Sequence, residues 1–289
     1  MEAHTVPGEP LSPLMTRFYE ARAIAVDIGH VLREMQTQRL ALKMISKGGS
    51  DFATEADAKA EKQILARLKT KFADDTFLAE ESAPANFDDY AAKSNLWVID
   101  PLDGTTNYSL GEENYAISIA FVEQGKPQFG IIYQPARRWL ATAIAPSEGY
   151  AAETQVDKRF ESGGAAHHTL TVSSETDPTK CTIGHNWSYS IASKERMNMQ
   201  LTKLIPGNFR AFVARSCAAG DLLSVADGRM HGYIQEYLKP WDVAAAGLMV
   251  QLAGGIVTGT DGTPWHPFRH DILASNGHLH GRLLELLNG

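Results

Sequence analysis

The sequence predicts a mixed α/β fold in which an α+β N-terminal half is followed by an α/β C-terminal half. Three observations support this prediction. Apolar residues recur at helical spacing near the N-terminus, strand-like segments follow one another over 115–145, and strands then alternate with helices in the second half. The chain has 289 residues, of which 44% are hydrophobic and 21% charged, so it is long and apolar enough for a sizeable core.

The first half is expected to begin with two helices. Apolar residues in steps of three and four predict a long first helix, and these are Leu14, Phe18, Ala21, Ala25, Ile28, Leu32 and Met35. A second helix is expected to begin at Thr54 and Asp57, which have the spacing of a capping box. Short strands are expected at 76–80 and 96–100. Two strands within 115–133 and a third at 139–145 predict an antiparallel meander.

The second half is expected to open with a loop, because 153–168 is polar and contains glycines. Beyond it the pattern predicts elements in the order strand, helix, strand, helix, and these lie at 209–215, 216–226, 230–235 and 241–253. Short strands and a terminal helix at 280–288 complete the chain. We therefore expect a flexible leader at 1–13, an α+β half at 14–152 and an α/β half at 153–289.

Composition narrows the class of protein. The 27 basic and 34 acidic residues leave a net charge of −7, which argues against general nucleic-acid binding because a phosphate backbone attracts basic surfaces. The first fifteen residues have no continuous apolar run, so neither a secretory signal nor a membrane anchor is expected. Cys181 and Cys217 are far apart in the sequence and have neither CxxC nor zinc-finger spacing. This is typical of a reduced, cytoplasmic protein.

Carboxylates stand at the ends of several predicted elements. In "LWVIDPLDGTTNY" (96–108) a buried-looking strand delivers Asp100, and Pro101 stiffens the link to Asp103. Mg²⁺ prefers such oxygen ligands, and the N–H groups of a helix that starts after Gly104 suit a phosphate. An isolated aspartate at a helix start is usually a cap, so Asp57 or Asp242 alone would indicate no site. The Asp100–Asp103 pair is not explained by a turn alone.

The aspartate spacing also bears on mechanism. Haloacid-dehalogenase-type phosphatases carry Asp-x-Asp-Gly-Thr after a strand, and the first aspartate is the nucleophile. Here the run is Asp-Pro-Leu-Asp, one residue longer, so a covalent aspartyl-phosphate is not expected.

Four segments resemble the motifs of a known family. "WVIDPLDGTTNY" and "PWDVAAAGLMVQLAGG" resemble the two signature motifs of the inositol monophosphatase family, within the lithium-sensitive, Mg²⁺-dependent phosphatase superfamily. "SDFATEAD" and "LAEES" resemble its two earlier motifs, and all four occur in the family's order across 14–289. The resemblance implies a layered αβαβα sandwich of the inositol monophosphatase/fructose-1,6-bisphosphatase type, usually a homodimer.

The resemblance also implies two to three Mg²⁺ ions per site. The first ion would be held by Glu80, Asp100 and the backbone carbonyl of Leu102. A second would be held by Asp100, Asp103 and Asp242, with a weaker third near Glu80. The first half of the chain would thus bind metal and phosphate, and the second half would complete the active site.

Catalytic and phosphate-binding roles follow from the same resemblance. Asp57 and Thr105 would orient and deprotonate the attacking water, with Glu80 also counted among the catalytic residues. The N–H groups of Gly104 and Thr105 would hold the phosphate, with Lys47 close by. Thr105 alone is a poor base, so its hydroxyl must pass the proton to Asp57.

The substrate pocket departs from the family pattern. Gln235 stands where many members carry a hydroxyl-binding Glu, and the neighbouring Glu236 would point to the opposite face of a strand. The residues that replace the usual Gly-Ser/Thr-Ala of the substrate loop are Ser216, Cys217 and Ala218.

A second uncertain segment is the run His185, Asn186 and Trp187. These side chains have the chemistry to contact a substrate ring, but a packed Trp with satisfied polar neighbours is the favoured interpretation.

Three functions stay open at this stage. The first is a Mg²⁺-dependent phosphomonoesterase that uses a metal-activated water on an inositol monophosphate-like polyol. The second is the same chemistry on histidinol phosphate, fructose 1,6-bisphosphate or a 3′-phosphonucleotide. The third is a non-catalytic regulatory or binding protein of the same fold, against which the complete set of acidic residues argues. The expected partners are a small phosphorylated metabolite and a second copy of the chain, without nucleic acid or membrane.

Overall fold

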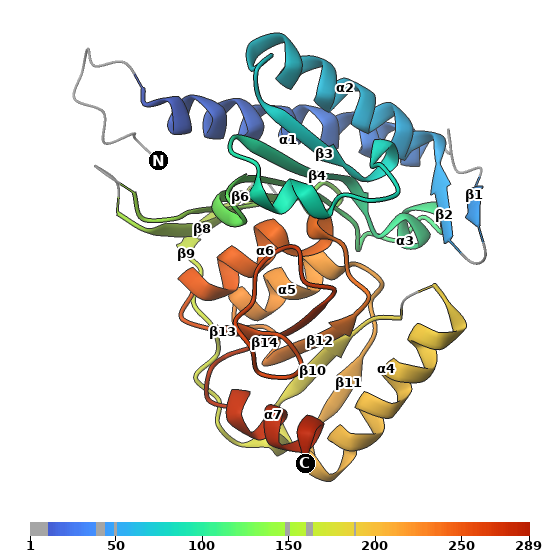
Figure 1. The fold of residues 1–289 in the computed structure, drawn as a ribbon, viewed down its shortest axis with the longest axis vertical. Helices are drawn as coiled ribbons and strands as arrows, with labels where there is room; N and C mark the ends of the chain where they lie inside the picture. Colours follow the sequence, from blue (N-terminus) through green and yellow to red (C-terminus); the bar gives the residue numbers. More distant parts are fainter. Residues whose placement is uncertain (1–10, 39–43, 49–50, 148–150, 160–163, 188) are drawn as a thin grey trace.

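Helices and sheets alternate in five layers in the computed structural model of the chain (Figure 1). The structure describes residues 11–38, 44–48, 51–147, 151–159, 164–187 and 189–289, with the backbone alone for 44–48 and 51–53. The predicted order, an α+β half followed by an α/β half, is confirmed.

The outer layer of the first half consists of α1 (Pro13–Thr37) and α2 (Glu55–Lys71). Both match the apolar periodicity of the sequence, since the predicted face of α1 is buried from Phe18 to Met35. At the start of α2 the expected capping box is present, because Thr54 and Asp57 bond reciprocally. These helices cover one face of the large sheet (Figure 1).

The large sheet has seven strands in sequence order, of which only the first pair is parallel. Its strands are β3 (Thr76–Ala79), β4 (Leu96–Asp103), β5 (Ala116–Glu123), β6 (Lys126–Gln134), β7 (Trp139–Ile144), β8 (Glu153–Arg159) and β9 (Ala165–Thr169). Alternate residues of β4 enter different cores: Trp97 and Ile99 pack toward α1 and α2, and Val98 packs toward the middle helices.

The predicted loop over 153–168 was wrong. Strands β8 and β9 occupy this stretch and extend the sheet from β7, so the sheet crosses residue 152, where the two halves were expected to divide. His167 and His168, expected as loop residues, lie in β9 and bond to Asp157 and Asp227. The polar sequence misled because backbone hydrogen bonds hold these strands, from β8 to β7 and from β9 to β8.

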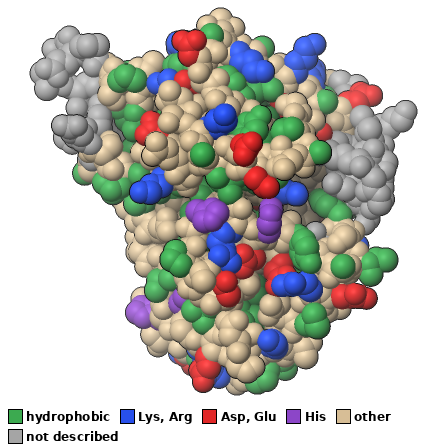
Figure 2. Space-filling model, in the orientation of Figure 1, with side chains coloured by type: hydrophobic (Ala, Val, Ile, Leu, Met, Phe, Trp, Pro, Cys, Tyr) green, Lys and Arg blue, Asp and Glu red, His purple; other side chains and the backbone are tan. Residues whose placement is uncertain are grey.

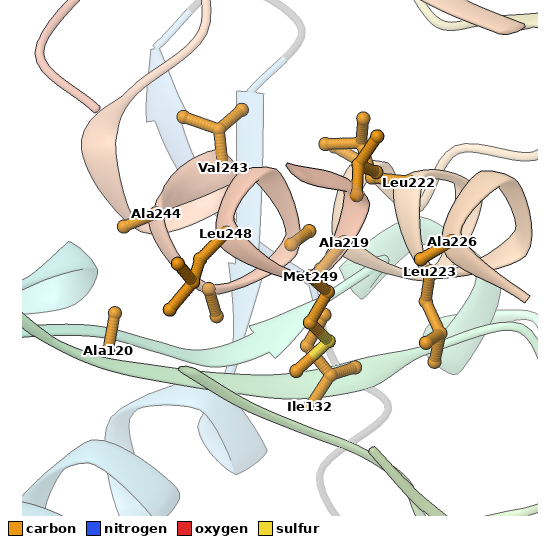
Figure 3. Packing of buried hydrophobic residues seen from close by; sticks show 14 of the residues in the cluster. Ala120, Ile132, Ala219, Leu222, Leu223, Ala226, Val243, Ala244, Leu248 and Met249 are labelled. Carbon is orange, nitrogen blue, oxygen red and sulfur yellow. The ribbon is translucent and has the colours of Figure 1, made fainter. Parts of the chain in front are cut away.

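The middle layer contains α5 (Ala218–Ala226) and α6 (Pro240–Leu252), which are mostly apolar and almost wholly buried because both sheets cover them. Figure 3 shows Leu248 and Met249 of α6 against Ala120 and Ile132 of the large sheet. Gly130 lets the helix approach closely, since a Cβ there would lie 2.7 Å from the Cα of Ala245.

The second sheet has the strand order β11-β10-β12-β14-β13. Its strands are β10 (Thr182–His185), β11 (Ala211–Val213), β12 (Gly232–Glu236), β13 (Ile256–Thr258) and β14 (Asp271–Ser275). The last layer consists of α4 (Ile191–Leu204) and α7 (His280–Asn288), and α7 has the predicted bounds. Smaller elements are α3 (Thr105–Ser109) and the hairpin of β1 (Met44–Gly48) and β2 (Asp51–Thr54).

Three further features concern the described helices, the two cysteines and the surface charge. None of the described helices is long and apolar enough to cross a membrane. Cys181 and Cys217 are both free and buried. On the face drawn in Figure 2, acidic and basic side chains are interspersed rather than gathered into areas of one sign.

Candidate active site

The end of β4 brings two carboxylates to one place. The register with β5 shifts between Asp100 and Asp103, so the strand bulges where Pro101 has no N–H to offer. The N–H of Leu102 donates to Asp100 Oδ1 at 2.9 Å, which holds that carboxylate at the bulge. The local sequence therefore places both aspartates at the edge of the same cavity.

This cavity has a volume of about 460 Å³ and is lined by four acidic residues, Glu80, Asp100, Asp103 and Asp242. Burial raises the pKa of Asp100 well above its usual range, and the neighbouring carboxylates of the cavity raise it further. Burial and its acidic neighbours raise the pKa of Asp242 in the same way. For Asp103, burial raises the pKa to about 7. Concentrated, desolvated negative charge of this kind favours binding of a cation.

The donor set fits a hard divalent cation. Buried carboxylate oxygens are the ligands that Mg²⁺ prefers, and their mutual repulsion would be relieved by its charge. Within the described residues, however, no three His, Cys, Asp or Glu side chains converge as a fully assembled metal site. The two oxygens of Asp103 accept from the N–H groups of Ala218 and Ala219 at 3.2 and 2.7 Å. The thiol of Cys217 also donates to Asp103 Oδ2, at 3.1 Å.

A second feature connects α2 to the start of α3. Thr105 Oγ1 lies 2.8 Å from Asp57 Oδ1 and 3.1 Å from the carbonyl oxygen of Leu102. The other oxygen of Asp57 accepts from the Thr54 N–H at 2.8 Å. Burial raises the pKa of Asp57, while the hydrogen bonds from Thr54 and Thr105 lower it. The arrangement is a hydroxyl at the cavity wall backed by a buried carboxylate, which suits transfer of a proton away from the cavity.

Gly104 joins β4 to α3 with a φ of +89°. A Cβ there would lie 2.8 Å from the carbonyl oxygen of Asn114, so a larger residue would be strained and also crowded. Gly104 and Thr105 line the cavity as predicted. Lys47 belongs to β1, and its side chain lies outside the described residues.

The far wall comes from β12 and a buried polar network. Gln235 lines the cavity, and its Oε1 accepts from the hydroxyl of Tyr233. Asn186 Nδ2 donates to that hydroxyl oxygen at 2.9 Å and to Asp221 Oδ2 at 3.0 Å. Asp221 also accepts from Arg215 Nε at 2.6 Å. Asp221, the carboxylate of this network, is therefore already paired.

The register of β12 is as predicted. Glu236 points to the opposite face of the strand, where its oxygens accept from Arg196 Nε at 2.7 Å and Gln200 Nε2 at 3.0 Å. Only Gln235 of this pair lines the cavity. The alternation of strand side chains thus decides which of the two neighbours can face a substrate.

The expectation for His185–Asn186–Trp187 was wrong in two respects. Trp187 is 40% exposed and lines the cavity, rather than packing in the core. His185 is buried, but its Nδ1 has no hydrogen-bond partner among the residues that the structure describes. Asn186 is buried within the polar network described above.

Most predicted site residues lie around this one cavity. Those that line it are Glu80, Asp100, Leu102, Asp103, Gly104, Thr105, Ser216, Cys217, Ala218, Gln235 and Asp242. Asp57 reaches the cavity through Thr105.

Sequence reasoning missed Tyr189 and Tyr237, which also line the cavity. The position of Tyr237 depends on a positive φ of +60°, for which a tyrosine gives no sequence signal.

Comparisons with known proteins show the family of the chain. The model of the inositol monophosphatase family matches residues 15–289. A Neisseria meningitidis protein named putative Nus factor SuhB is 33% identical over 252 residues, which cover 86% of this chain and 88% of that protein. An inositol-1-monophosphatase of Synechocystis is 33% identical over 245 residues, covering 82% and 77%.

The fold is found in solved structures as well. The inositol monophosphatase from Anabaena superposes with a TM-score of 0.74 at 28% identity, covering 96% of each chain. The predicted fold class and the predicted kind of enzyme, a phosphatase, are both confirmed. The chain belongs to the inositol monophosphatase family.

Proposed function

We propose that this protein is a Mg²⁺-dependent phosphomonoesterase that hydrolyses small phosphorylated alcohols by direct attack of water. The expected substrate class is a polyol of the inositol monophosphate kind. The observation that carries the proposal is the meeting of four carboxylates, of which Asp100 is buried, and the Thr105–Asp57 pair around one cavity. The longer spacing between Asp100 and Asp103 argues against a covalent aspartyl-phosphate.

The acidic residues would hold two to three Mg²⁺ ions. One set would be Glu80, Asp100 and the Leu102 carbonyl, and the other Asp100, Asp103 and Asp242. Bound Mg²⁺ would supply the positive charge that lowers the pKa of the attacking water and neutralises the phosphate.

The chain's own groups would handle the proton and orient the ester. Thr105 donates its hydroxyl proton toward Asp57, so the oxygen of Thr105 is free to accept a proton from water in the cavity. The pKa of Asp57 is raised by burial, which makes it a better proton acceptor than an ordinary carboxylate. The N–H groups of Gly104 and Thr105 would bind phosphate oxygens, and Lys47 would lie near them.

Several finer points belong to the same proposal. Histidinol phosphate, fructose 1,6-bisphosphate and a 3′-phosphonucleotide are alternative substrates for the same chemistry. A homodimer in the cytoplasm, inhibition by Li⁺, and the absence of nucleic-acid partners are expected as for a metabolic phosphatase. The remote alternative is a regulatory protein, and some relatives carry the name Nus factor. The complete carboxylate set favours the enzyme.

The test is phosphate release by the purified protein from a panel of phosphorylated metabolites. We expect release that requires Mg²⁺, is abolished by excess EDTA, and falls with millimolar-scale Li⁺. Hydrolysis of a chiral thiophosphate ester in ¹⁸O-water should proceed with inversion at phosphorus. Full activity in EDTA would overturn the metal assignment, and retention would overturn direct attack by water.

A further inference from the structure

Three aromatic side chains form an open rim around the cavity. Trp187, Tyr189 and Tyr237 all line it, yet they are 40%, 50% and 43% exposed. Large hydrophobic side chains exposed together at a cavity mouth indicate a surface kept for contact with a ligand. We call these three residues the aromatic rim.

The two ends of the rim are held in place. His185 packs its ring against Trp187 at 90° and 5.4 Å between centroids, and His185 is itself buried. The guanidinium of Arg196 lies 5.9 Å from the Tyr237 ring centroid, and Arg196 is fixed by its bond to Glu236. The rings are therefore supported from outside the cavity.

The backbone conformation of Tyr237 supports a ligand-binding role for the aromatic rim. Its φ of +60° is uncommon for a bulky residue, and strain of this kind gathers at ligand sites. This conformation directly follows β12, which carries Gln235 on the cavity wall. The turn thus brings an aromatic ring to the same cavity as the polar wall.

Among the described residues, the polar wall formed by β12 and its neighbours offers no unpaired carboxylate to a ring covered in hydroxyls. The Oε1 of Gln235 already accepts from Tyr233, and Asp221 is paired with Arg215 and Asn186. The nearby carboxylate of Glu236 faces away from the cavity, toward Arg196. A flat apolar ring needs none of these acceptors, whereas it gains from stacking on indole or phenol.

We propose that the preferred substrates are phosphate monoesters whose alcohol carries a flat aromatic ring, which stacks on the rim with Trp187 as the main contact. This inference rests on the proposed phosphomonoesterase function, and for that same site it places aromatic alcohols ahead of the polyol class expected from the family. The phosphate lies at the carboxylate end of the cavity, and the ring lies at its mouth. Trp187 is then a specificity residue that takes no part in the chemistry.

A matched pair of substrates tests the proposal. The esters 2-phenylethyl phosphate and 2-cyclohexylethyl phosphate have similar leaving groups and similar size, but only the first has an aromatic ring. We expect the wild-type kcat/KM to favour the phenyl ester by about fivefold, mostly through a lower KM, because stacking adds to simple burial. A ratio near one in the wild-type protein would overturn the proposal.

Variants locate the effect on the rim. Trp187→Leu keeps apolar bulk without a π-face, so the ratio should fall toward one, and Trp187→Phe should restore most of it. The control is Ile191→Ala. Ile191 is an apolar residue of the same segment, is 75% exposed and does not line the cavity. This control should leave the ratio as in the wild-type protein. An unchanged ratio in Trp187→Leu would assign the preference elsewhere and contradict the inference.

A binding measurement separates this inference from the proposed function. Saturation-transfer NMR in EDTA should show transfer from the protein to the ring protons of 2-phenylethyl phosphate, and Trp187→Leu should weaken it several-fold. Ring contact without hydrolysis of any ester would refute the phosphatase proposal and leave the rim as a ligand site. Hydrolysis with no ring contact and a ratio near one would refute the rim alone.

Discussion

At the residue scale, Gln235 is the side chain that we expect to reach the alcohol part of a substrate. It is 8% exposed, lines the cavity, and accepts a hydrogen bond from Tyr233 through Oε1. A glutamate there would keep this bond and leave its second oxygen free to accept from a substrate hydroxyl. A single residue of β12 thus decides whether the wall offers a charged acceptor.

We therefore predict that Gln235→Glu raises kcat/KM for myo-inositol 1-phosphate by roughly tenfold. The reason is that hydrogen bonds to charged groups contribute about 1.5–3 kcal/mol, against about 1 kcal/mol for neutral ones. For p-nitrophenyl phosphate, which has no hydroxyls, steady-state kinetics should show little change. Asp242→Asn should depress both substrates together. Equal effects of Gln235→Glu on the two esters would mean that Gln235 does not contact the alcohol.

At the scale of elements, one carboxylate connects two segments. Asp57 uses Oδ2 to cap α2, accepting from the Thr54 N–H at 2.8 Å and from the Thr54 hydroxyl at 2.5 Å. Its Oδ1 accepts from Thr105 at the start of α3. The cap therefore positions the oxygen that accepts from the Thr105 hydroxyl, so an ordinary helix start also contacts the wall of the cavity.

Removing the hydroxyl of Thr105 should leave the cap intact and stop the proton transfer. We expect Thr105→Ala to lower kcat by about a hundredfold with little change in KM, since general base catalysis contributes 10²–10⁴-fold. Thr105→Ser, which keeps the hydroxyl, should retain kcat within about tenfold of wild type. Steady-state kinetics at saturating Mg²⁺ measures both. If Thr105→Ala is no slower than Thr105→Ser, the hydroxyl has no role in catalysis.

At the scale of the whole molecule, a buried acidic side chain lies in the middle helical layer, between the two sheets. Asp221 of α5 has 0% exposure and pairs with Arg215. Burial raises its pKa to about 6, and it does so despite the opposing effect of Arg215. In the same region, the carbonyl oxygen of Arg215 accepts from Asn107 and Asn114 at 2.7 and 2.8 Å, which joins the two halves of the chain.

The raised pKa of Asp221 has a defined effect on stability. The native state binds the Asp221 proton more tightly than the unfolded chain does. The stability that this proton contributes is therefore fully present below the unfolded pKa and is lost as the pH rises toward 6. The free energy of unfolding falls by about 3 kcal/mol because the pKa of Asp221 is higher in the native state by roughly two pH units. In urea unfolding, the free energy of unfolding of Asp221→Asn should therefore rise relative to that of wild type between pH 4 and 6. A difference independent of pH would contradict the raised pKa.

How far the sequence predicts the structure differs between element types. Helices α1, α2 and α7 were predicted because apolar periodicity and capping are local signals. Strands β8 and β9 were missed, because the backbone pairing of β8 with β7 and of β9 with β8 leaves no apolar alternation in their polar side chains. The burial of Trp187 was mispredicted for a related reason, since residue type alone does not say which surface a side chain meets.

The sequence by itself determined the carboxylates, the turn from Asp100 to Asp103, and the family, because these depend on residues close together in the chain or on recognisable motifs. Only the tertiary structure decided that Asp57 bonds to Thr105, that Asp103 is held by the first N–H groups of α5, and that aromatic side chains surround the mouth of the cavity. These contacts join segments separated by 48 to more than 100 residues. Burial of both faces of the middle helices brings such distant segments together, and no local pattern encodes that arrangement.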